Sequence, residues 1–185
     1  MLAMRPETET SDEVLATRAM RGDPEAISDL VRRYSGPLYR FIQRYRPLRD
    51  DCDDLLQETW VSVWTHLRGF DPRRRFSTWL FQIALNHCRD HARRDRVRSA
   101  YRFEARGWPE GRPPDSPEAW TESRQVLESI EELSPRQKEV LLLRYYHGFS
   151  EQETSEILDC PRGTVKSRLH QAMAEIRRRL LTREG

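Results

Sequence analysis

The spacing of hydrophobic positions along the chain predicts helices throughout and no strand. Asp23 and Pro24 form a helix start signal, an N-cap residue followed by proline at the first helical position. In the first half of the chain the expected helices are residues 12–21, a helix from Pro24 past Ile42 with a break near Gly36-Pro37, residues 53–67, and residues 77–94.

The pattern changes near Ser99. The stretch "GWPEGRPPDSPEAW" places four prolines and two glycines between Gly107 and Trp120, which is typical of a linker. Helices resume near Ala119, and two capping-box signals follow, at Ser134 with Gln137 and at Ser150 with Glu153. The sequence therefore predicts an all-α fold with two helical domains, residues 10–97 and 119–183, joined by a flexible linker at 98–118.

The C-terminal domain is expected to contain a helix-turn-helix. A short helix from Ser150 to Leu158, a tight break at Asp159-Cys160-Pro161 and a longer helix match that arrangement. The longer helix has one apolar side, formed by Val165, Leu169, Ala172, Met173, Ile176 and Leu180. Its other side carries polar and basic groups near the helix N-terminus, the end of a recognition helix that reaches base edges in the major groove. The alternative is the solvated face of an ordinary helical bundle.

The expected helix at 53–67 has two different faces. Its apolar stripe consists of Leu56, Trp60, Val63, Trp64 and Leu67. A second face carries Asp54, Gln57, Glu58, Val61 and Thr65. Because phosphates repel carboxylates, this acidic and amide face suits a protein partner better than DNA. On the residues alone, an ordinary solvated acidic face remains the alternative.

The helix expected at 77–94 becomes basic towards its end, with Asn86, Arg89 and Arg93 in the polar part. Such a patch can neutralise phosphates. The preceding loop places Phe70 close to Arg73, Arg74 and Arg75, and an aromatic ring beside cations is suited to binding single-stranded bases. Trp79 is expected in the core.

Composition adds several exclusions. Charged residues make up 34% of the 185 residues, yet the net charge is only +2, so the charge is segregated locally. No stretch approaches the roughly 20 apolar residues of a membrane span, and the N-terminus lacks the apolar core of a signal peptide, which predicts a cytosolic protein. The three cysteines form no C-x-x-C pair.

No enzymatic chemistry is indicated. The segment "NHCRDH" brings His87, Cys88 and His91 close together, but no fourth ligand is evident and we expect no metal site. No nucleophilic arrangement and no phosphate-binding glycine loop is found. We therefore expect a protein without a cofactor that is not an enzyme.

Two long segments carry a family resemblance. "LSPRQKEVLLLRYYHGFSEQETSEILDCPRGTVKSRLHQAMAEIRRRL" resembles the promoter −35-binding domain of bacterial sigma factors and also the output domain of LuxR-type regulators. "DDLLQETWVSVWTHLRGFDPRRRFSTWLFQIALNHCRDHARR" resembles the core domain of extracytoplasmic-function (ECF) sigma factors. With both in this order, the whole chain resembles an ECF sigma factor.

The resemblance implies partners and residue roles. Core RNA polymerase would be bound through its β′ clamp and β flap, promoter DNA would be recognised, and an anti-sigma factor is an expected partner. The clamp residues would be Asp54, Gln57, Glu58 and Val61; the −10 residues Phe70, Arg75, Asn86, Arg89 and Arg93; and the −35 residues Arg144, Thr164, Lys166, Ser167, Arg168, His170 and Gln171.

Two other functions remain as alternatives at this point. A stand-alone LuxR-like helix-turn-helix regulator would bind duplex operators tightly without polymerase. A helical adaptor without a nucleic-acid role would leave the basic residues of the recognition helix unexplained.

Overall fold

The structure is a computed structural model that describes residues 10–45, 52–99, 129–130 and 132–183. These residues form α-helices with short 3-10 and π-helical turns, and none of them forms a strand. The described helices fall into two compact units, α1–α4 and the C-terminal helices with most of α7. The all-α, two-domain prediction is confirmed.

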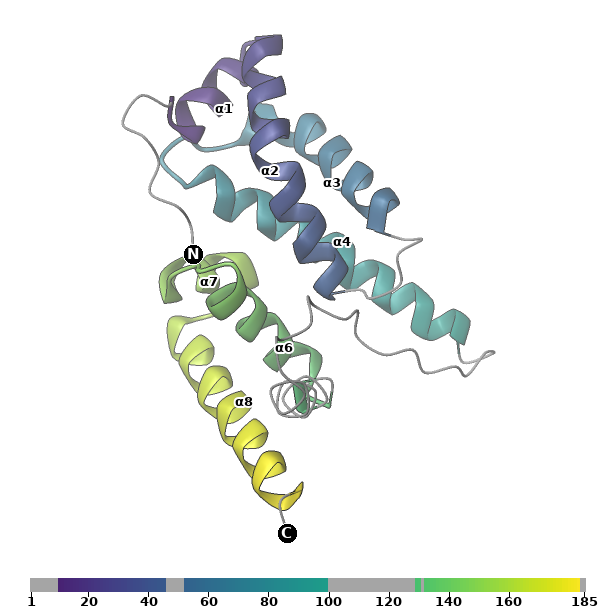
Figure 1. Cartoon of the computed structure of the whole chain (residues 1–185). Coiled ribbons are helices and arrows are strands. Elements are labelled where there is room, and N and C mark those ends of the chain that lie inside the picture. The colour runs from purple at the N-terminus through teal and green to yellow at the C-terminus, as the bar shows by residue number, and fades with distance from the viewer. Residues whose placement is uncertain (1–9, 46–51, 100–128, 131, 184–185) are drawn as a thin grey trace, which may run out of the picture. The chain divides into compact units, whose positions relative to one another are not determined.

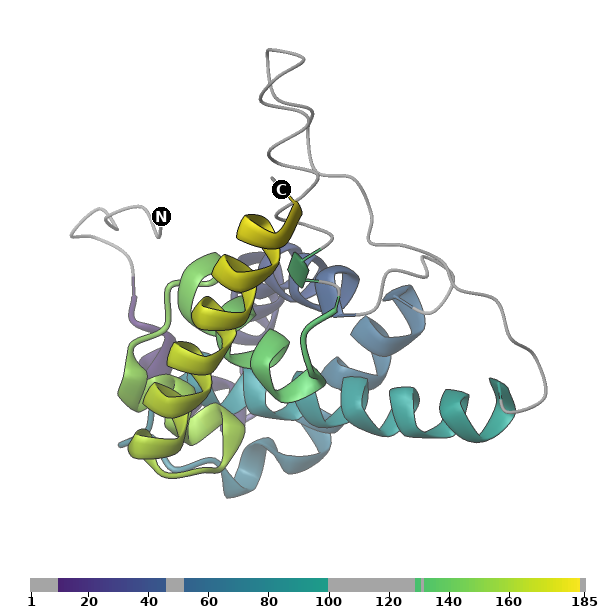
Figure 2. The ribbon, with the colours of Figure 1, turned by 90° about the horizontal axis from the view of Figure 1, so that it is seen from below.

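The N-terminal unit consists of α1 (Asp12–Met20), α2 (Pro24–Tyr45), α3 (Cys52–His66), the 3-10 turn η2 (Leu67–Gly69) and α4 (Phe76–Ser99). Helix α1 packs on α2, and α2, α3 and α4 pack on one another (Figure 1). Both views show the C-terminal part of α4 extending past α2 and α3 (Figure 2). The centre of this core is formed by fully buried Leu15, Leu30, Leu38, Phe41, Ile42, Leu55, Val63, Phe76, Leu80 and Leu85.

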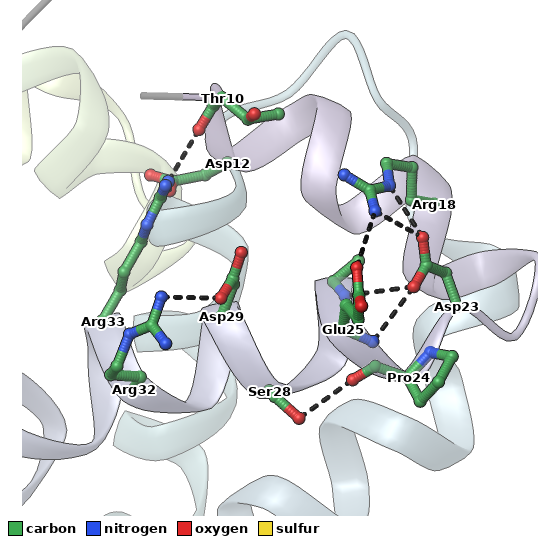
Figure 3. A network of polar contacts seen from close by, with 11 residues as sticks. Thr10, Asp12, Arg18, Asp23, Pro24, Glu25, Ser28, Asp29, Arg32 and Arg33 are labelled. Atoms are coloured by element: carbon green, nitrogen blue, oxygen red, sulfur yellow. Dashed lines mark hydrogen bonds and ion pairs between the residues drawn. The ribbon is translucent and has the colours of Figure 1, made fainter. Parts of the chain in front are cut away.

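The junction of α1 and α2 follows the expected start signal. The Asp23 carboxylate accepts hydrogen bonds from the backbone N–H of Glu25 at 3.0 Å and of Ala26 at 3.3 Å, which caps α2. Its other oxygen pairs with the Arg18 guanidinium at 2.7 Å (Figure 3). The hydrogen bond from Arg18 is the main reason that the pKa of Asp23 is lowered.

A buried polar cluster fixes the start of α1 against α2. Asp12 is 6% exposed and accepts hydrogen bonds from Arg33 at 2.9 Å and from the Tyr34 hydroxyl. Arg33 also donates to the Thr10 carbonyl at 2.7 Å (Figure 3). The next residue, Glu13, accepts a 3.3 Å hydrogen bond from the backbone N–H of Phe76. Helix α1 therefore also positions the first residue of α4.

The structure corrects two details of the N-terminal unit. Helix α2 runs without a break through Pro37, because the buried side chains of Leu30, Leu38 and Phe41 hold both of its halves in the same core. In α3 the fully packed leucine is Leu55, which is 1% exposed, and not Leu56. The buried face includes Thr59, whose hydroxyl donates to the Leu55 carbonyl at 2.7 Å, so this polar side chain is satisfied inside the core.

The C-terminal unit contains α6 (Pro135–Leu141), the π-helical turn η3 (Leu142–Tyr146), α7 (Glu151–Leu158) and α8 (Arg162–Arg183). Both capping predictions are confirmed. The backbone N–H of Ser134 donates to the Gln137 side chain at 3.0 Å, and that of Ser150 donates to Glu153 at 2.8 Å. The Ser150 hydroxyl in return accepts from the N–H of Glu153 at 3.2 Å.

A tight turn joins α7 to α8, as the helix-turn-helix prediction requires. Asp159 adopts φ 50°, a left-handed conformation that aspartate tolerates better than most residues. The Ser155 hydroxyl closes the turn with a 2.7 Å hydrogen bond to the Cys160 carbonyl. Helix α8 packs on α6, with Val165 and Ala172 fully buried.

Most of the predicted linker lies outside the described residues, as does the expected start of a helix near Ala119, whereas residues 129 and 130 are helical. Residues 98 and 99 belong to α4, which continues to Ser99 and thus beyond the expected end at Arg94.

Candidate nucleic-acid and polymerase interfaces

The first turns of α8 bring six of the predicted −35 residues together. Lys166, Ser167, His170 and Gln171 are exposed, and Thr164 and Arg168 are half-buried. The Lys166 ammonium lies 3.7 Å from the Glu151 carboxylate of α7, and the Arg168 guanidinium lies 3.8 Å from the Cys160 sulfur. The surface therefore presents short polar groups beside two cations that contacts with α7 and the turn hold in place.

Arg144, the seventh predicted −35 residue, belongs to η3 and not to α8. Its guanidinium donates to the backbone carbonyl of Phe149, just before α7, and its Nε is buried without a hydrogen-bond partner among the described residues. In this structure Arg144 holds the start of the helix-turn-helix, and a role in DNA binding remains a prediction.

Farther along α8, Arg178 and Arg179 are paired with acidic residues. Glu175 accepts hydrogen bonds from Arg178 at 2.6 and 3.0 Å and from Arg179 at 2.6 Å. Arg179 also pairs with Glu132. The hydrogen bond with Arg178 lowers the pKa of Glu175 and raises the pKa of Arg178. This end of the helix therefore carries less uncompensated positive charge than the sequence suggests.

The predicted −10 residues of α4 share one helical face. Asn86, Arg89 and Arg93 are spaced by three and four residues, so their side chains follow one another along the helix. Asn86 and Arg93 are exposed, Arg89 is half-buried, and Arg93 lies 3.7 Å from Asp90. Arg75 precedes α4, and at about 1.5 Å of rise per residue it lies roughly 16 Å from Asn86. These residues therefore form a row along α4 and not a single pocket.

Phe70 lies inside the protein. It is 3% exposed, and its ring packs edge-on to Phe76 at a centroid distance of 5.7 Å and against Trp79 at 5.1 Å. Trp79, expected in the core, is half-buried on the outer side of this cluster. A base could stack on Phe70 only after the ring left the cluster. Base capture by Phe70 therefore stays a prediction that requires such a movement.

The predicted polymerase-binding residues form an exposed face of α3. Asp54, Gln57, Glu58 and Val61 are all exposed, and the Val61 side chain is 64% accessible. Glu58 lies 3.6 Å from His87 Nδ1, while His87 Nε2 forms a 2.7 Å hydrogen bond with Ser62. An imidazole from α4 thus supports the edge of an otherwise acidic and apolar surface.

The expectation about metals concerned the "NHCRDH" segment. His87 is engaged by Ser62, and Cys88 is fully buried. Among the residues that the structure describes, no three histidine, cysteine or acidic side chains are grouped so as to hold a metal ion. In the same part of the chain, no helix is both long enough and apolar enough to cross a membrane.

Three contacts near these surfaces escaped sequence reasoning: Ser62 with His87, Glu151 with Lys166, and Glu13 with the start of α4. Each joins residues 15 to 63 positions apart. A short-range sequence pattern carries no signal for the contact of Ser62 with His87 or for that of Glu13 with α4. The contact of Glu151 with Lys166 could have been found by placing the start of α7 beside the second turn of α8 in a helix-turn-helix.

Comparison with known proteins identifies the two units. The family model "Sigma-70 region 2" matches residues 30–98, and "Sigma-70, region 4" matches residues 123–176. The two matches define the chain as a sigma-70-type factor. An ECF RNA polymerase sigma-E factor from Haemophilus influenzae is 30% identical over 92% of this chain and 95% of its own length. The chain belongs to the ECF RNA polymerase sigma factors.

Other relatives agree. The sigma-E factor of Escherichia coli K12 is 31% identical over 90% of this chain and 92% of its own length. The solved structure of CnrH in complex with the cytosolic domain of CnrY has a TM-score of 0.71 at 29% identity, covering 95% of this chain and all of that one. The structure of RpoE with the anti-sigma factor NepR from Bartonella quintana has a TM-score of 0.68 at 23% identity and covers 83% of this chain and 95% of that one. This similarity supports the fold.

Proposed function

We propose that this chain is an alternative sigma factor that binds core RNA polymerase through α3, contacts the −10 element with α4 and reads the −35 element with the first turns of α8. The observation that carries the proposal is the separation of surfaces by charge. An exposed acidic and apolar face lies on α3, whereas exposed cations and amides lie on α4 and α8.

Charge decides which surface meets which partner. Asp54 and Glu58 would repel DNA phosphates, so α3 suits a protein, and Val61 adds an exposed apolar contact. Asn86 and Arg93 on α4 can contact the backbone and bases of a separated strand. Lys166, Ser167 and Gln171 offer groups that match base edges in a major groove. All these contacts are binding contacts, so the proposal includes no chemical step and no cofactor.

A location and one further partner follow from the proposal. Because core polymerase and promoter DNA are in the cytoplasm of a bacterium, the chain would act there. CnrH, a structural relative at 29% identity, was solved with the cytosolic domain of CnrY. We propose that this chain also binds a protein partner, an anti-sigma factor that covers the α3 or α8 surface and so keeps it from polymerase or DNA.

The test is reconstitution. Tagged full-length chain should retain core RNA polymerase in a pull-down, and the resulting holoenzyme should initiate transcription in vitro from a subset of a promoter library. Core polymerase alone and core with an Asp54→Arg, Glu58→Arg variant are the controls. A chain that binds duplex DNA tightly but neither retains polymerase nor supports initiation would instead be a stand-alone regulator.

A further inference from the structure

One acidic residue lies inside the basic surface of the helix-turn-helix. Glu151 is the first residue of α7, and its carboxylate lies 3.7 Å from both the Arg162 guanidinium and the Lys166 ammonium of α8. The Glu151 side chain is 30% exposed, whereas those of Arg162 and Lys166 are 58% and 63% exposed. Glu151 therefore lies beneath two cations that face outward.

We infer that Glu151 is a specificity-determining residue of the −35 interface, a role that rests on the proposed function. Two cations that share one carboxylate have less positive charge to offer phosphates than two free cations. Any duplex, whatever its sequence, presents phosphates, and placing them here also places them near the Glu151 charge. The carboxylate thus weakens the sequence-independent part of DNA binding.

A base contact is affected less. The lysine ammonium has three donors, so Lys166 can keep one towards Glu151 and turn another towards an acceptor on a base edge. The carboxylate also limits where the ammonium can move, because an ammonium that leaves Glu151 loses its attraction to that charge and leaves Arg162 alone to pair with the partly covered carboxylate. Glu151 therefore holds the Lys166 ammonium at one place in the protein. A base with an acceptor at the matching position can bind the ammonium there, whereas the phosphates of an arbitrary sequence are not placed to do so.

Replacing Glu151 by glutamine should separate the two effects, since it keeps the shape and removes the charge. Holoenzyme carrying Glu151→Gln should bind mixed-sequence duplex more tightly, with a salt slope steeper by up to about one unit. Its preference for the best −35 sequence over mixed sequence should fall about three- to tenfold, as specificity relaxes at the positions next to Lys166.

Asp159→Asn is a matched control. Asp159 is an exposed acid in the same motif, it has no ion pair with Arg162 or Lys166, and asparagine tolerates its left-handed backbone. This variant removes the same charge eight residues away. It should leave the −35 preference unchanged and alter the salt slope less than Glu151→Gln does.

The experiment compares wild-type, Glu151→Gln and Asp159→Asn holoenzymes on a duplex promoter library randomised through the −35 region, with mixed-sequence duplex as the non-specific probe. Each is repeated with Lys166→Ala. The loss of preference caused by Glu151→Gln should disappear in the Lys166→Ala background. Equal behaviour of Glu151→Gln and Asp159→Asn, or a loss that persists without Lys166, would overturn this role for Glu151. Wild-type holoenzyme that ignores the −35 sequence would overturn the proposed function itself.

Discussion

Asp23 shows how one residue can both start a helix and fix a neighbouring one. Its carboxylate caps α2 and also pairs with Arg18 of α1, so both helices depend on its ionised form. Asp12 acts similarly from a buried position, with Arg33 and Tyr34 as partners. Short acidic side chains at helix ends thus determine how α1 joins the core.

The first prediction concerns Asp23 and pH. Because the folded protein lowers the pKa of Asp23, the ionised form stabilises the fold above the ordinary carboxyl pKa of 3.8, and this contribution is lost as pH falls through the lowered value. Asp23→Asn keeps a capping side chain but loses the charge. It should be less stable than wild type in urea unfolding at pH 7, and the difference should shrink at acid pH. Asp29→Asn is the control, because Asp29 is a half-buried acid of α2 that pairs with the exposed Arg32 at 2.7 Å and caps no helix. A pH-independent difference for Asp23→Asn would contradict the prediction.

The second prediction concerns the exposed residues of α3. Gln57→Ala combined with Glu58→Ala should weaken binding to core polymerase at least severalfold while leaving the unfolding midpoint nearly unchanged, because neither side chain is buried. Competition for core against labelled wild-type chain measures this directly. Glu25→Ala with Ser28→Ala removes a comparable pair from the exposed side of α2. If both double variants bound core polymerase with equal affinity, this face of α3 would not be the polymerase-binding surface.

At the scale of helices, the local signals were the reliable ones. The caps at Asp23, Ser134 and Ser150 were predicted correctly because each involves residues within three positions of one another. The exposed set on α3 was also predictable, since Asp54, Gln57, Glu58 and Val61 are apart from any apolar stripe. What the sequence did not reveal depends on packing between helices.

Three residues show why. Pro37 was expected to break α2, but burial on both sides of it outweighs one lost hydrogen bond. Leu56 was expected in the core instead of Leu55, because a buried threonine, Thr59, does not appear in an apolar pattern. Phe70 was expected to bind single-stranded bases beside the arginines, yet Phe76 and Trp79 cover it. In each case the deciding contact comes from another turn or another helix.

The third prediction concerns α8 as a reading helix. Lys166 or Arg168, in the first turns, should contribute base contacts: alanine there should cost roughly 1–3 kcal/mol at one −35 position and relax specificity at that position. Arg178, which is paired with Glu175, should contact only phosphate or solvent, so Arg178→Ala should weaken all promoters alike and flatten the salt slope by at most about one unit. Transcription from a library randomised through the −35 element gives both results. Uniform losses for all three variants would show that this helix holds DNA without reading it.

On the scale of the whole chain, net charge says little about DNA binding. The 32 basic and 30 acidic residues nearly cancel, giving +2. The acids that matter are near the cations: Glu151 beside Lys166, Asp90 beside Arg93 and Glu175 beside Arg178. Each unit therefore offers few uncompensated contacts to DNA by itself, which limits its affinity.

The last prediction follows from that limit. Free full-length chain should bind a duplex promoter weakly, whereas holoenzyme should bind it tightly and with sequence preference. Core polymerase would hold the two units at the promoter spacing, so that binding of one raises the effective concentration of the other, typically a gain of 10² to 10⁴ in affinity. Titration of a labelled promoter with free chain, core and holoenzyme at one salt concentration measures the gain. The Gln57→Ala, Glu58→Ala variant changes assembly with core polymerase and not the DNA contacts. When enough of this variant is added to saturate core polymerase, the resulting holoenzyme should therefore bind the promoter with wild-type affinity. Nanomolar, sequence-specific binding by the free chain would show that the two units are already arranged for the promoter without polymerase.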